Sequence, residues 1–128
     1  KNLKTVRLVW KDLPTPRIFG GDASIAHLGL WCAGEQGKFW QFLDATSTRN
    51  QELTHSDMLK TITNLELDNA KWRACLETGS YNTAIANNAA LAKNLGFNKG
   101  PALFINNKQL DLTQEVNLPD LLDSLVKP

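Results

Sequence analysis

The chain has 128 residues, of which 42% are hydrophobic and 21% charged, and its formal net charge is +1. A length near the commonest domain size allows one hydrophobic core, and a composition near the globular average excludes a disordered or fibrous protein. The balanced charge, with no window of concentrated Lys and Arg, argues against nucleic acid as a partner, and no apolar run approaches the roughly 20 residues of a membrane-spanning helix.

The first predicted element is a strand at Thr5–Trp10, where β-branched and aromatic side chains alternate between two faces. Asp12 follows directly and is expected to serve the structure. Pro14 and Pro16 then end the strand, because proline lacks an amide donor, and Gly20-Gly21 adds a hinge. Residues 1–21 are therefore expected to form a strand and a loop.

The loop leads into a predicted pair of helices, which could also form one bent helix. Asp22 is a suitable N-cap for the first, whose apolar residues recur at helical spacing until Gly34. The second begins near Lys38. Aromatic side chains at this spacing usually belong to a core, although they could also line an apolar groove. The aromatic residues of this pair of helices are Trp31, Phe39, Trp40 and Phe42.

Three further helices are expected up to residue 96. Thr54–Asp57 resembles a capping box, with an acidic side chain three residues after a threonine, and it opens the first of them. Asp68 caps the second, which Gly79 ends. Ser80 starts a longer third helix, which Gly96 ends.

The C-terminal part is predicted to form a hairpin and a helix. Ala102–Ile105 is a buried strand, Asn106-Asn107 a turn, and Gln109–Leu112 the partner strand. Leu118–Val126 closes the chain as an amphipathic helix, with Pro119 in its first turn. The sequence therefore predicts an α/β chain with one strand, four or five helices, a hairpin and a final helix.

Few residues have the types and spacing that catalysis or metal binding requires. Glu35, Gln36 and Lys38 flank two glycines and are expected to form a solvated helix junction and not an acid–base set. His27 and His55 have no Cys, Asp or Glu at ligand spacing around them, so no metal site is predicted. Nucleotide-binding and serine-hydrolase fingerprints are absent, and no cofactor is expected.

Three stretches of the chain carry a recognisable pattern. Cys32–Trp40 has the sequence Cys-Ala-Gly-Glu-Gln-Gly-Lys-Phe-Trp, and Cys75–Tyr81 is followed by a helix that ends at Leu95-Gly96-Phe97. Gly100–Asn107 places a proline before an apolar strand and a turn. In this order the three resemble the helical-insert signature, the later helices and the cis-proline loop of the DsbA-like thioredoxin family of thiol–disulfide oxidoreductases. Together they span nearly the whole chain.

The resemblance implies a thioredoxin-like (DsbA-like) sheet with a helical insertion. Residues 1–21 would supply a strand and a loop, 22–96 the helical insert, and 97–128 the proline loop, hairpin and C-terminal helix of a single partial domain. In such a fold a central strand and a helix that opens with Cys-x-x-Cys lie before the position of Val6, so both are expected to be missing from this chain. The resulting gap in the sheet is expected to be filled by a missing N-terminal segment or by a second copy.

The resemblance gives Cys32 and Cys75 a structural role. They are too far apart in sequence to form the Cys-x-x-Cys that lowers one thiol pKa and resolves a mixed disulfide, so no catalytic residue is predicted in the chain. A structural disulfide between them is the first alternative. Two buried, reduced cysteines that pack as small apolar residues are the second, and a reactive thiol or a metal ligand is the third.

Gly100 and Pro101 are the predicted substrate-binding residues. In the resembled family a cis-proline lies beside the active-site dithiol, and the backbone before it pairs with an extended substrate segment. The alternative is an ordinary trans-proline at the first residue of a strand.

Three functions are expected from this reading. In the first, the chain is part of a DsbA-like oxidoreductase that forms or exchanges disulfides in secreted proteins, and it is inactive by itself. The second is a non-catalytic peptide-binding or chaperone-like module, and the third is a relative of glutathione transferases or isomerases that use a serine. The expected partners are extended or unfolded Cys-containing polypeptides, and the expected location is extracytoplasmic, periplasmic or secreted, although the first residues do not resemble a signal peptide.

Overall fold

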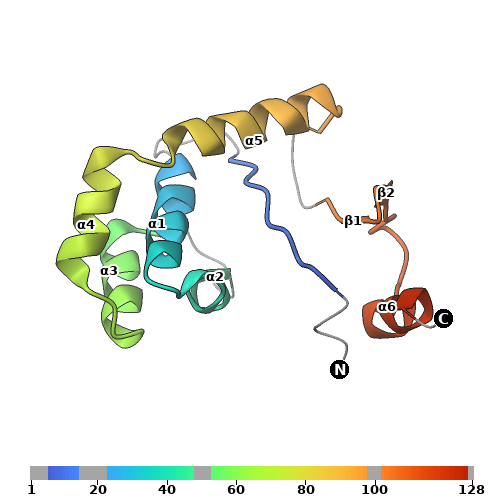
Figure 1. Ribbon diagram of the computed structural model, residues 1–128, viewed down its shortest axis with the longest axis horizontal. Helices are drawn as coiled ribbons and strands as arrows, with labels where there is room; N and C mark the ends of the chain where they lie inside the picture. Colours follow the sequence, from blue (N-terminus) through green and yellow to red (C-terminus); the bar gives the residue numbers. More distant parts are fainter. Residues whose placement is uncertain (1–5, 15–22, 48–52, 98–101, 127–128) are drawn as a thin grey trace. The chain divides into compact units, whose positions relative to one another are not determined.

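The computed structural model describes residues 6–14, 23–47, 53–97 and 102–126. The chain divides into two compact units, one of Asp12–Asn98 and one of Lys1–Lys11 with Lys99–Pro128. Among the described residues the first unit holds helices α1 to α5, and the second holds a short hairpin and helix α6 (Figure 1). In chain order the elements are α1 Ala23–Glu35, α2 Phe39–Ser47, α3 His55–Asn64, α4 Asn69–Thr78, α5 Asn82–Asn94, β1 Phe104–Ile105, β2 Lys108–Gln109 and α6 Leu118–Val126.

Helix α1 is the centre of the larger unit, since it packs against α2, α3, α4 and α5. A glycine allows α3 and α4 to approach it closely, because a Cβ on Gly29 would lie 3.1 Å from both Met58 Sδ and Trp72 Cζ2. The Trp72 indole N–H also donates to the Gly29 carbonyl oxygen at 2.9 Å. The buried apolar side chains are those of Leu28, Leu30, Cys32, Ala33, Phe42, Met58, Ile62, Trp72, Cys75 and Ile85. The hydrophobic core of the described residues therefore lies within the helical unit.

Local capping explains where α3 begins and where α4 begins and ends. Thr54 Oγ1 accepts the Asp57 amide at 3.1 Å and the Asp57 carboxylate accepts the Thr54 amide at 3.1 Å, which confirms the predicted capping box. Asp68 caps α4 by accepting from the Lys71 amide at 3.1 Å. Gly79 ends α4 as predicted, with a φ of 62° in the left-handed region that favours glycine.

Helix α5 begins two residues later than the sequence indicates. It starts at Asn82, and Tyr81 at its N-cap makes no side-chain capping hydrogen bond. The hydroxyl of Ser80, the predicted first residue, is hydrogen-bonded to the Thr78 hydroxyl at 2.9 Å and so serves the turn between α4 and α5. Gly96 follows the helix with a φ of 86°, as expected for a glycine that ends a helix.

The smaller unit contains the predicted hairpin and C-terminal helix. Phe104 pairs with Gln109 and Ile105 with Lys108 in antiparallel register. Asn106-Asn107 form the turn with φ values of 49° and 67°, a conformation that asparagine tolerates, and a two-residue turn makes its immediate neighbours pair. The second strand therefore begins one residue earlier than predicted. The expected burial of the first strand is wrong at Phe104, which is 43% exposed.

The strand predicted at Thr5–Trp10 is wrong for the residues that the structure describes. Residues 6–14 have no regular secondary structure, and Leu8 and Val9 are exposed. An alternating apolar pattern forms a strand only where a neighbouring strand completes the ladder of backbone hydrogen bonds. The sheet in the described part of the chain consists of β1 and β2, and residues 6–14 are not part of it.

Candidate functional site

The two cysteines of the chain form a disulfide that joins α1 to α4. The Cα atoms of Cys32 and Cys75 lie 5.7 Å apart, and the exposed fractions are 1% and 6%. The predicted disulfide is therefore present. The oxidised chain does not fit the alternatives, which were two reduced cysteines, a reactive thiol or a thiol metal ligand. The bond links positions 43 residues apart, and on the chain-entropy model it stabilises the fold by about 4 kcal/mol.

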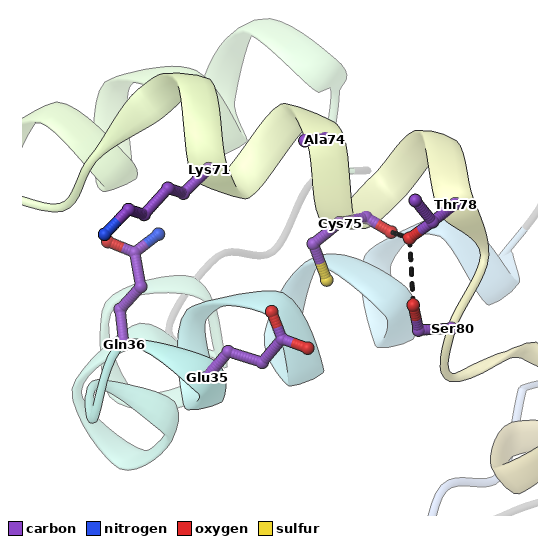
Figure 2. A pocket seen from close by; sticks show the side chains of 7 residues that line it. All are labelled: Glu35, Gln36, Lys71, Ala74, Cys75, Thr78 and Ser80. Carbon is purple, nitrogen blue, oxygen red and sulfur yellow. Dashed lines mark hydrogen bonds between the residues drawn. The ribbon is translucent and has the colours of Figure 1, made fainter.

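A pocket of about 560 Å³ opens between α1 and α4 beside this disulfide (Figure 2). Cys75 is the one buried residue among those that line it, and its side chain points from α4 into the space towards α1. The other lining residues are polar or small and mostly exposed, so the pocket is an open surface depression beside the disulfide. They are Glu35, Gln36, Lys71, Ala74, Thr78 and Ser80.

Two hydrogen bonds fix one edge of the pocket. Gln36 Nε2 donates to the Asp68 carbonyl oxygen at 3.1 Å, and the Asp68 amide donates to Gln36 Oε1 at 2.8 Å. Both ends of the Gln36 amide are thus used by the backbone before α4. Glu35 is exposed at the end of α1, whereas Gln36 and Lys38 are half-buried, so the predicted helix junction is solvated only in part.

Tyr81 connects this region to the aromatic side chains of α1. Its ring stacks on the Trp31 indole with centroids 5.5 Å apart and planes inclined by 15°. Its hydroxyl is hydrogen-bonded to the Glu35 carboxylate. Burial, followed by this hydrogen bond and the negative charge of Glu35, raises the pKa of Tyr81 above its ordinary value of 10.0. The phenol therefore remains protonated at neutral pH and donates to Glu35.

The Asp12 carboxylate is buried at the meeting point of its own segment, α1 and α5. Trp31 Nε1 and Asn88 Nδ2 each donate to Asp12 Oδ2 at 2.8 Å, and His27 Nδ1 lies 3.0 Å from Asp12 Oδ1. The side chain is 1% exposed, and a buried carboxylate is tolerated when several donors satisfy it. The network therefore holds Asp12 against two helices.

The sequence predicts a structural task for Asp12 but does not identify its partners. His27, Trp31 and Asn88 are 15, 19 and 76 positions away, and no local spacing connects them to Asp12. The available signal is an acidic side chain two residues after an apolar stretch, which must be paired if it is buried. This signal indicates that the Asp12 carboxylate requires hydrogen-bond donors, but it does not identify the residues that provide them.

The predicted core aromatic residues are divided between the interior and the surface. Phe42 is buried, Trp31 and Phe39 are half-buried, and Trp40 is exposed. The rings form a continuous series, with centroid distances of 5.2 Å from Trp31 to Phe39 and 4.9 Å from Phe39 to Trp40. The core expectation is therefore confirmed for Phe42 and wrong for Trp40, which lies at the surface end of the series.

The other predicted site lies outside the described residues. Gly100 and Pro101 belong to the segment 98–101, so their part in substrate binding stays a prediction. In the described ranges no group of three or more His, Cys, Asp and Glu side chains is placed to hold a metal ion. None of the helices found there combines the length and the apolar character needed to cross a bilayer.

Five helices, two of which (α1 and α4) are joined by a buried disulfide, are followed by a hairpin and a helix in the described residues. These elements define a mostly helical α/β protein with a small sheet. The family described as Thioredoxin matches residues 4–124, and the chain belongs to this family. Its fold is thioredoxin-like with a helical insertion, as the three sequence stretches predict.

Two known proteins are similar to this chain. A thioredoxin-like oxidoreductase from Silicibacter pomeroyi has the same fold with a TM-score of 0.68 and 24% identity, over 88% of this chain and 63% of that chain. The Na(+)/H(+) antiporter NhaA 3 of Salinispora tropica is 29% identical over 105 residues, which are 82% of this chain and 16% of the antiporter. The chain thus spans less than two thirds of each of these proteins.

Proposed function

We propose that the chain is part of a DsbA-like thiol–disulfide oxidoreductase that forms or exchanges disulfides in secreted proteins. One observation carries the proposal: the thioredoxin family matches residues 4–124, while both cysteines of the chain are held in the disulfide between Cys32 and Cys75. Exchange in this family requires a free Cys-x-x-Cys thiolate, so the 128 residues support the reaction without performing it. In this proposal they contribute the helical insert and the proline loop.

The substrates in this proposal are extended or unfolded polypeptides that contain cysteine. Gly100 and Pro101 would pair with the substrate backbone, as the family resemblance implies, since an X-Pro bond locked in cis presents a backbone edge. A second copy or a preceding segment would complete the sheet beside the first residues of this chain. An oxidising, extracytoplasmic location is supported by the disulfide, because such bonds persist in that environment.

A non-catalytic peptide-binding module is the second candidate. It is favoured by the apolar side chains that the hairpin and the segment around α6 leave exposed, because apolar surface of this kind is typical of sites that bind unfolded polypeptide. These side chains are Phe104, Leu112, Val116, Leu118 and Leu125.

The experiment compares the 128-residue chain with the gene product that includes the codons preceding Lys1. We expect the longer product to contain Cys-x-x-Cys and to accelerate reduction of insulin by dithiothreitol, and the 128-residue chain to have no effect. Replacing both cysteines of that motif with serine in the longer product is the matched control and should abolish the acceleration.

Two results would contradict the oxidoreductase proposal. One is acceleration by the 128-residue chain that is lost in Cys32→Ser. The other is a longer product without a Cys-x-x-Cys that suppresses aggregation of an unfolded protein, which would favour the peptide-binding module.

A further inference from the structure

We propose that small thiols open the Cys32–Cys75 disulfide from the pocket between α1 and α4, and that they attack Cys75 and form a mixed disulfide there. This reaction requires no Cys-x-x-Cys, so it does not depend on the proposed oxidoreductase function. It makes Cys75 a site of reversible modification by a small thiol that carries carboxylate and ammonium groups.

Both cysteines are buried, and of the two Cys75 alone lines the pocket. Cys75 lines the pocket and is 6% exposed, whereas Cys32 lies inside α1 and is 1% exposed. A thiolate breaks a disulfide by approaching one sulfur while the other leaves, so the sulfur that faces a pocket receives the attack. Figure 2 shows Cys75 directed into the space that Glu35 and Lys71 border. The geometry therefore assigns Cys75 as the attacked sulfur and Cys32 as the leaving one.

The pocket has a size and a lining suited to a small thiol with charged groups. Its volume of about 560 Å³ lies within the range of roughly 300–1,000 Å³ found for small-molecule sites. Lys71 lies one helical turn before Cys75 and lines the pocket, and its side chain extends towards Gln36 at the edge of the pocket (Figure 2). From this edge its ammonium can attract an approaching thiolate or a carboxylate of the thiol. The Glu35 carboxylate can pair with an ammonium group and repels the thiolate. The Thr78 hydroxyl donates to the Cys75 carbonyl oxygen and is bonded to the Ser80 hydroxyl, so these two groups are already used within the protein.

The exchange is balanced in atoms and electrons. The thiolate sulfur forms a bond to Cys75 Sγ as the bond between the two protein sulfurs breaks, and the electron pair leaves with Cys32, which takes a proton from water. A second thiol molecule can then attack the mixed disulfide, which releases the oxidised small disulfide and leaves both cysteines reduced. The Cys32 thiolate can equally return to Cys75 and expel the small thiol, since the disulfide already holds the two side chains adjacent.

The test treats the oxidised 128-residue chain with reduced glutathione, followed by an acid quench and unfolding in N-ethylmaleimide. Peptide mass spectrometry then locates the adducts. We expect glutathione on Cys75 and maleimide on Cys32, with an initial rate that rises in proportion to the glutathione concentration. Glutathione on Cys32, an equal distribution, or a rate that is independent of glutathione and equal to the unfolding rate would overturn the proposal.

Three substitutions test the route through the pocket. Glu35→Gln should raise the initial rate about threefold and Lys71→Gln should lower it about threefold, which is the size expected of one exposed charge. Lys60→Gln removes an exposed lysine of α3 that does not line the pocket and should leave the rate unchanged. Circular dichroism checks that each variant keeps its helices. Rates that Glu35→Gln and Lys71→Gln leave unchanged would overturn the pocket route.

Discussion

The Trp31 side chain contacts two separate polar centres of the helical unit. Its indole N–H donates to Asp12, and its ring stacks on Tyr81, whose hydroxyl reaches Glu35. Tryptophan is suited to this place because one large apolar ring carries a single polar donor. An amphipathic side chain on α1 therefore joins the buried carboxylate network to the rim of the disulfide pocket.

The alkaline titration of Tyr81 tests this arrangement. We expect Glu35→Gln to lower the pKa of Tyr81 while leaving it above 10.0, because burial is the largest cause of the raised pKa and the substitution does not change it. Tyr81 is the chain's single tyrosine, so the ultraviolet absorbance of phenolate reports on it alone. Glu77→Gln, which removes an exposed carboxylate of α4, is the control and should leave the titration unchanged.

The raised pKa also has a consequence for stability. The folded protein holds the Tyr81 proton more tightly than the unfolded chain, so Tyr81 contributes stability that is fully present below pH 10.0. That contribution is lost as the pH rises from 10.0 through the folded pKa. The loss should be smaller in Glu35→Gln, and a loss of equal size in the two proteins would show that Glu35 does not act on Tyr81.

At the scale of elements, the sequence predicts what local chemistry determines. The boundaries at Thr54, Asp68 and Gly79 and the full extent of α6 are as predicted, because a cap depends on backbone groups within one helical turn. The strand predicted at Thr5–Trp10 does not form in its described residues, because a strand depends on a partner elsewhere in the chain. The partners of Asp12 escape prediction for the same reason.

The Asp12 network makes a prediction about how elements are held together. Asp12→Ala should lower the free energy of unfolding by about 3 kcal/mol, because it removes a buried carboxylate and leaves half-buried donors on α1 and α5 without their acceptor. Urea unfolding followed by tryptophan fluorescence measures the change. Asp44→Ala removes an exposed aspartate of α2 and should change the free energy by less than about 0.5 kcal/mol. Similar effects of the two substitutions would mean that Asp12 does not anchor its segment.

At the scale of the whole molecule, burial is unevenly distributed between the two units. The buried side chains among the described residues lie between Asp12 and Ile85, and α6 has none. The resemblance predicts a helical insert of residues 22–96, and the compact unit extends back to Asp12. The difference arises because Asp12 is bonded to α1 and α5, a long-range contact that a helical pattern does not reveal.

This distribution predicts that the fragment Asp12–Asn98 folds on its own. It contains the described hydrophobic core, the Asp12 network and the disulfide, so its free energy of unfolding should lie within about 1 kcal/mol of that of the full chain. Urea unfolding followed by circular dichroism of both proteins makes the comparison. The fragment with Cys32→Ser and Cys75→Ser is the matched variant and should lose about 4 kcal/mol, the stabilisation expected from closing this loop. A fragment that shows no cooperative transition with the disulfide intact would mean that residues 99–128 are needed to fold the helices, although none of those that the structure describes is buried.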